Sequence, residues 1–124
     1  MLEQLAQEPL FDESQIALLR DALGEDELRE MFADLPEAAQ RSLEAIQAAL
    51  EANDLEQAKR AAHVLKGVAS SFGAARLALI AREIELELPT VASIAQSVPV
   101  LMAALNDTSA SLPGGSEGST GGAR

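Results

Sequence analysis

The sequence predicts an all-α protein: an antiparallel four-helix bundle with a short additional N-terminal helix and a disordered C-terminal tail. Its apolar fraction of 48% comes mainly from Ala and Leu, and only 2% of the residues are aromatic. Such a composition favours helices over sheet. Apolar residues also recur at i, i+3, i+4 and i+7 spacing in successive segments, as in helices that bury one face. Four such segments with short connections pack most economically as an antiparallel bundle.

The first main helix is predicted over about residues 14–23. Asp12 or Ser14 is its expected N-cap, because a short side-chain oxygen accepts bonds from the first free N–H groups. Gly24 is expected to end the helix. The preceding stretch, residues 2–9, is expected to add a short helical turn over one end of the core.

The second helix is predicted to be the longest, over about residues 25–52. Pro36 is expected to kink it or to mark a boundary within it, because proline lacks a backbone donor. The third helix follows the sequence "AND", with Asn53 as its expected cap and Glu56 at the capping-box position. Gly73 is expected to end this helix in a left-handed conformation.

Two further helices are predicted, over about residues 74–88 and 91–107. Thr90 is a candidate N-cap of the last helix, and Pro99 a candidate kink within it. The end of the chain, "PGGSEGSTGGAR", holds five of the eight glycines and no large apolar residue. It is therefore expected to be a disordered tail or a vector-derived remnant outside the fold.

The net charge of −11 argues against a nucleic acid or an anionic membrane as the partner, because both require phosphate neutralisation. No apolar run is long enough for a membrane span, and the acidic N-terminus does not resemble a signal peptide. A cytoplasmic monomer is the default expectation. The absence of cysteine excludes disulfides and Cys-ligated zinc, and a single histidine excludes a multi-His metal site within one chain.

That single histidine, His63, projects about 120° from the apolar stripe of the third helix and should point out of the core. The neighbouring cations would attract a phosphate group. The nearby glycine costs roughly 1 kcal/mol of helix stability relative to alanine, but it leaves a bare patch for close approach by another protein. In the plainer interpretation, His63 is a solvated residue and the cations pair with Glu56 and other acids. The neighbours on this face are Lys59, Arg60, Lys66, Gly67 and Ser70.

Together, "HVLKG" and the following "SSFGA" resemble the signature of histidine-containing phosphotransfer (HPt) domains. That signature is His-x-Leu-Lys-Gly, with a glycine six residues further on, usually followed by alanine. The resemblance spans about residues 12–108 and implies an antiparallel four-helix bundle. Residues 1–11 are then an N-terminal extension, and residues 109–124 form the tail.

The resemblance implies that His63 accepts a phosphoryl group, through its distal ring nitrogen, from the aspartate of one receiver domain and passes it to another. Lys66 would stabilise the phosphoryl charge, and Gly67 would give the receiver room. The docking face would also include Lys59, Arg60 and Ser70. The receiver would supply Mg²⁺ and the aspartate, so no cofactor and no autonomous enzymatic activity are expected. Residues 31–35 are a candidate for an adjoining apolar docking patch, but their spacing favours a place in the core.

Three alternatives stay open. The dimerisation helix pair of a sensor histidine kinase also exposes a histidine, but an acidic residue and then a proline typically follow it, whereas Val64 and Lys66 follow here. A small hydrolase using His63 as general base needs an orienting carboxylate and a nucleophile, and Glu56 and Ser70 lie two turns away on opposite sides. A helical adaptor bundle that is never phosphorylated is the third. An HPt module could stand alone or belong to a larger hybrid kinase.

Overall fold

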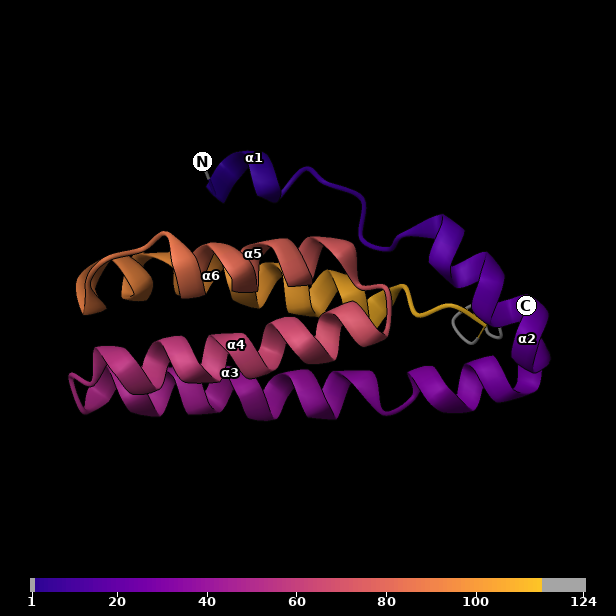
Figure 1. Ribbon diagram of the computed structural model, residues 1–124, viewed down its shortest axis with the longest axis horizontal. Helices are drawn as coiled ribbons and strands as arrows, with labels where there is room; N and C mark the ends of the chain where they lie inside the picture. The colour runs from indigo at the N-terminus through magenta and orange to yellow at the C-terminus, as the bar shows by residue number, and fades with distance from the viewer. Residues whose placement is uncertain (1, 115–124) are drawn as a thin grey trace.

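The computed structural model describes residues 2–114, and within that range it contains helices and turns but no strand. The predicted all-helical class is therefore confirmed for the described part of the chain. The predicted N-terminal turn is present as the first helix. The helices, shown in Figure 1, are α1 (Leu2–Leu5), α2 (Glu13–Phe32), α3 (Leu35–Glu51), α4 (Leu55–Ser71), α5 (Ala75–Leu86) and α6 (Val91–Ala110).

Helices α3 to α6 pack lengthwise: α3 lies against α4 and α6, and α5 lies against the same two helices. Short turns at Ala52–Asp54 and Phe72–Ala74 reverse the chain between neighbours. Each helix turns one apolar stripe inward, and burying one large aliphatic side chain contributes about 1.5–3 kcal/mol. The fully buried side chains of these four helices include Ile46, Leu65, Leu77, Ile80, Ile84, Ile94 and Leu101.

Helix α2 is broken in the middle, at Gly24, whose φ of 82° and ψ of 167° are not helical. The predicted end of the first main helix at Gly24 is therefore confirmed. Asp12 caps the helix, its side chain accepting from the backbone N–H groups of Ser14 and Gln15. In Figure 1 the second half of α2 lies roughly in line with α3, beyond the end of the four packed helices.

The segment predicted as helical over residues 25–52 forms two helices, with the boundary close to Pro36 that was one of the two expected outcomes. It is interrupted at Ala33 and Asp34, and Pro36 lies in the first turn of α3. Proline is tolerated there because the N–H that it lacks would have no intrahelical acceptor. Of the two roles expected for Pro36, the structure shows the boundary and not the kink.

The predicted cap of the third helix is displaced by one residue. Asp54 caps α4, its side chain accepting from the Gln57 N–H, while Asn53 adopts a left-handed φ of 56°. Asparagine tolerates this conformation better than most residues. At the other end of α4, Gly73 has the predicted left-handed conformation, with a φ of 66°.

The last helix begins as predicted, with Thr90 and Ser93 forming a reciprocal capping box, but it extends to Ala110. The tail predicted from residue 109 is therefore wrong at its start. Leu112 packs against the core, and the Gly114 carbonyl accepts a bond of 3.0 Å from Arg29 Nε. The rest of the predicted tail, residues 115–124, lies outside the described residues.

The three phenylalanines of the chain form one cluster. Phe32 packs edge-on against Phe11 and Phe72, with ring centroids 5.9 Å and 5.3 Å apart, respectively. Such pairs contribute about 0.5–1.5 kcal/mol beyond their buried area. The cluster joins the N-terminal segment, the end of α2 and the end of α4. It holds the segment before α2 against the turn that follows α4.

Candidate functional site

His63 lies on the outer face of α4, and its side chain is 63% exposed. The helix presents a stripe of buried residues, Ala58, Ala62, Leu65 and Ala69, to the core. A residue one position after Ala62 is rotated by about 100° from that stripe. The predicted outward orientation of His63 is confirmed.

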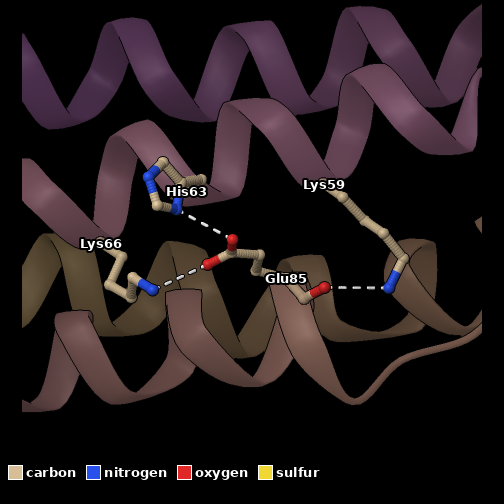
Figure 2. Close-up of polar contacts among 4 residues, drawn as sticks. All are labelled: Lys59, His63, Lys66 and Glu85. Atoms are coloured by element: carbon tan, nitrogen blue, oxygen red, sulfur yellow. Dashed lines mark hydrogen bonds and ion pairs between the residues drawn. The ribbon is translucent and has the colours of Figure 1, made fainter.

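A carboxylate that the sequence analysis missed lies directly beside this histidine (Figure 2). Glu85, in the last turn of α5, places its Oε2 2.8 Å from His63 Nδ1 and its Oε1 2.9 Å from Lys66 Nζ. The Glu85 side chain is only 19% exposed. One carboxylate therefore bridges the histidine and the lysine across the contact between α4 and α5.

The Lys66 ammonium lowers the pKa of Glu85 below its ordinary value, and the hydrogen bond to His63 acts in the same direction. Partial burial opposes this shift, but the favourable contacts outweigh it. Glu85 is therefore ionised at neutral pH, and an ionised carboxylate only accepts hydrogen bonds. The Glu85 carboxylate is therefore a largely buried anion that lies between His63 and Lys66 of α4.

Lys59 also turns toward α5 (Figure 2). Its Nζ donates a hydrogen bond of 2.9 Å to the backbone carbonyl of Glu85. Carbonyls in the last turn of a helix lack intrahelical partners, and a lysine can satisfy them. Lys59 thus caps the C-terminal end of α5, an arrangement that reasoning along α4 alone did not reveal.

The other predicted site residues lie along the same face without joining this contact. Arg60 pairs with Glu56, 3.6 Å apart, as the plainer interpretation anticipated. Gly67 is exposed, and a Cβ built on it would have no heavy atom within 4 Å outside its own helix backbone. Ser70 is also exposed, and its backbone carbonyl accepts a bond from Gln15.

Two shallow grooves flank His63. The first, between α4 and α5, is lined by Glu56, Lys59, Arg60, His63, Glu85 and Leu86. The second, between α3 and α4, is apolar. It is lined largely by alanines, with Val64, itself 55% exposed, at its edge. A histidine between a charged groove and an apolar groove has the composition of a protein-docking surface.

The residues around 31–35 do not form an apolar docking patch. Phe32 and Leu35 are 0% and 1% exposed, so they belong to the core, as their spacing favoured. The exposed apolar surface next to His63 comes instead from Val64 and from alanines of α3 such as Ala45.

Glu85 also changes one step of the reasoning against a hydrolase. Helical spacing along α4 places no orienting carboxylate near His63, but the structure supplies one from α5. Among the described residues, however, the polar contact of His63 leads to Glu85 and not to a serine or threonine nucleophile. Over the same range, no group of three or more His, Asp or Glu side chains is arranged to hold a metal ion.

None of the helices within residues 2–114 is both long and apolar enough to cross a membrane.

In a comparison with known protein families, the Hpt domain model matches residues 27–111. This range contains α3 to α6 and includes His63, Lys66 and Glu85. No curated protein and no solved structure matches the chain.

Proposed function

The chain belongs to the Hpt domain family, and on this premise we propose that His63 is the phosphoacceptor of a two-component phosphorelay. In this role it takes a phosphoryl group from the aspartate of one receiver domain and passes it to the aspartate of another. The observation that carries the proposal is the exposed imidazole of His63, with Lys66 and the uncovered Gly67 one turn away. The antiparallel bundle proposed to carry it spans residues 12–108.

The transfer is a substitution at phosphorus. The lone pair of His63 Nε2 forms the N–P bond as the bond between phosphorus and the aspartyl oxygen breaks, and the aspartate leaves as a carboxylate. The phosphorylated ring keeps its proton on Nδ1 and carries a positive charge beside the negative phosphoryl group. The next receiver's aspartate reverses these steps. Mg²⁺ is expected from the receiver, because phosphoryl transfer depends on positioning and charge neutralisation.

Lys66 is proposed to neutralise the charge of the phosphoryl group. Its ammonium lies on the same side of α4 as His63 and is held by Glu85 Oε1 at 2.9 Å. The flexible four-carbon stem of a lysine allows its ammonium to move a short distance toward a new anion. The chain then acts as a carrier, and autonomous catalysis is not part of the proposal.

The proposed docking face joins the charged and the apolar groove on either side of His63. Gly67 allows the receiver's backbone to come close, and Arg60 and Ser70 border the approach. Lys59 was predicted for this face, and its hydrogen bond to the Glu85 carbonyl also favours a supporting role within the site. We place the protein in the cytoplasm as a monomer, in keeping with its strongly acidic composition.

The test is phosphate transfer from a panel of receiver domains, each phosphorylated in the presence of Mg²⁺, to the full chain. Acid-labile, alkali-stable phosphate on the wild type and none on His63→Gln would support the proposal. An Arg20→Gln variant is the matched control, because Arg20 is a cation on α2 that pairs with Glu25 and lines neither of the two grooves. Absence of transfer from every receiver to a folded, monomeric chain would favour the adaptor alternative. A stable homodimer would favour the histidine-kinase alternative.

A further inference from the structure

Three cations of α4 lie within about one turn of His63, and the structure holds two of them in contacts inside the protein. Lys59 and Lys66 both contact Glu85 of α5. Arg60 instead forms an exposed ion pair with a residue of its own helix. We propose that Arg60 is the cation that moves onto the phosphoryl group of phosphorylated His63 and completes its charge neutralisation. The inference rests on the proposed function of His63, but its first test requires no receiver domain.

The first step concerns Lys66, whose ammonium lies 2.9 Å from Glu85 Oε1. That oxygen is buried, and within residues 2–114 Lys66 is its one polar partner. Moving the ammonium away would leave a buried carboxylate oxygen unpaired, which is costly. A lysine ammonium has three donors, so Lys66 can turn a free N–H toward a phosphoryl group only while it stays on Glu85. Its charge is therefore already shared with a carboxylate.

The second step concerns Lys59, which is held in the same way. Its Nζ donates a hydrogen bond of 2.9 Å to the backbone carbonyl of Glu85, and this contact is partly buried. Figure 2 shows the Lys59 ammonium on the far side of the Glu85 backbone from the His63 ring. A carbonyl in the last turn of a helix needs such a donor. Lys59 is therefore not available to a phosphoryl group on the ring.

Arg60 lies on the other side of His63. A helix turns by about 100° per residue, so Arg60 projects about 60° from His63 in one direction and Lys66 about 60° in the other. The grooves agree with this placement, because Arg60 lines both the charged groove that contains His63 and the apolar groove toward α3. Residues three apart on a helix have neighbouring side chains, with Cβ atoms about 5–6 Å apart. A long arginine side chain reaches across this distance.

The guanidinium of Arg60 can leave its present partner at little cost. It lies 3.6 Å from the Glu56 carboxylate, and the two side chains are 63% and 87% exposed. Ion pairs as exposed as this one contribute little, because water screens both charges. A phosphoryl group carries more negative charge than a carboxylate and offers three acceptor oxygens, and a planar guanidinium binds such oxygens in pairs. The phosphoryl group is therefore expected to displace Glu56 as the partner of Arg60.

The other charged groups near the ring do not take the place of Arg60. Arg41 of α3 pairs with Glu37 of its own helix at 3.3 Å, and it lines the apolar groove and not the groove that contains His63. Glu85 is an anion, and Figure 2 shows Nε2 of the ring turned away from it. Arg60 therefore combines a position beside His63 with freedom to move.

The direct test measures the pKa of the phosphoryl group itself. Phosphoramidate can phosphorylate the full chain without a receiver: its P–N bond breaks, the bond between His63 Nε2 and phosphorus forms, and ammonia leaves. His63 is the only histidine of the chain, so the ³¹P NMR signal of phosphohistidine needs no further assignment. A neighbouring cation favours the dianion, so Arg60→Gln is expected to raise this pKa, which weakens acid dissociation by about 2-fold to 5-fold. Arg60→Lys, which keeps the charge, is expected to restore most of the wild-type value.

Two further variants control this measurement. Arg20→Gln makes the same change in net charge on α2, where Arg20 pairs with Glu25, and it should leave the pKa of the phosphoryl group unchanged. Glu56→Gln removes the competing partner of Arg60 and should lower that pKa. An unchanged pKa in Arg60→Gln, or a raised one in Glu56→Gln, would overturn the inference.

Transfer kinetics separate this role of Arg60 from a role in docking alone. With a receiver that phosphorylates the wild type, Arg60→Gln is expected to lower the maximal transfer rate by about 10-fold, as for the loss of one hydrogen bond to a charged group. If Arg60 serves docking alone, the half-saturating receiver concentration rises instead and the phosphoryl pKa does not move. That result would overturn the inference and leave the role of His63 intact. If no receiver phosphorylates the wild type, the proposed function fails, and the ³¹P titration still tests Arg60.

Discussion

Replacing Gly67 by alanine is expected to make the protein more stable and less active. The residue lies inside α4, exposed, and a Cβ there would have no neighbour within 4 Å outside its own helix backbone. The new methyl group therefore meets no steric cost in the free protein. A glycine in a helix interior is less favourable than alanine by about 0.8–1.0 kcal/mol. For a domain of this size, such a gain raises the midpoint of thermal unfolding by about 4 °C.

The same methyl group projects from the surface one turn beyond His63. If a receiver's backbone packs against Gly67, the methyl group enters a filled interface, and overpacking of this kind costs about 1–3 kcal/mol. The expected result is a fall in the phosphotransfer rate of roughly 5-fold to 150-fold. The measurement is thermal unfolding together with transfer kinetics from a receiver that phosphorylates the wild type.

Gly73→Ala is the matched control because the chemical change is the same and the expected sign of the stability change is opposite. Gly73 has a left-handed φ of 66°, and a Cβ there would lie 3.2 Å from Gln15 Cδ. A left-handed conformation costs a non-glycine residue about 1–2 kcal/mol. A destabilised Gly67→Ala variant, or a stabilised one that transfers at the wild-type rate, would refute the reasoning about Gly67.

The remaining predictions concern charge, capping and docking. The pKa of Glu85 is lowered in the folded protein, chiefly by Lys66. The ionised carboxylate therefore stabilises the fold at every pH above its pKa in the unfolded chain, about 4.3. This stabilisation is lost as the pH falls through the lower pKa of the folded state. The difference in free energy of unfolding between wild type and Glu85→Gln should accordingly shrink as the pH falls below about 5 in urea titrations, and a constant difference would contradict the assignment. Asp54→Ala removes the side-chain bond to the Gln57 N–H and should lower the free energy of unfolding by about 1 kcal/mol; full stability by chemical denaturation would show that this cap contributes nothing. Val64→Glu changes an exposed side chain and should alter stability by less than about 0.5 kcal/mol but slow phosphotransfer, whereas an unaffected rate would exclude Val64 from the docking face.

Much of the fold could be predicted because the determining signals are local. The apolar stripe of α4, the reversal at Gly73 and the cap at Thr90 each depend on residues within one or two turns of one another. The cap of α4 was missed by one residue because Asn53 and Asp54 are both good caps. The structure separates them by backbone conformation, with Asn53 left-handed and Asp54 extended, and nothing in the local pattern distinguishes the two.

Sequence reasoning could predict only the part of the candidate site that lies on one helix, α4. His63, Lys66 and Gly67 share α4, so helical spacing alone places them on one face. Glu85 follows 22 residues after His63, and its role depends on the rotation of α5 against α4, which sequence spacing does not reveal. The available signal was its place directly after Ile84, a core residue, which puts Glu85 at the edge of the buried stripe.

The phenylalanine cluster has a consequence for anyone who moves this domain into another protein. The family match begins at residue 27, whereas Phe11 and Ile16 are 6% and 2% exposed and belong to the same packed core as Phe32. A chimera cut at the family boundary would carry α4 and His63 but leave the rings of Phe32 and Phe72 without the packing of Phe11 and Ile16. The segment that must be transferred to keep the core intact is therefore longer than the segment that matches the family model. A fusion junction placed before residue 11 keeps this end of the core covered.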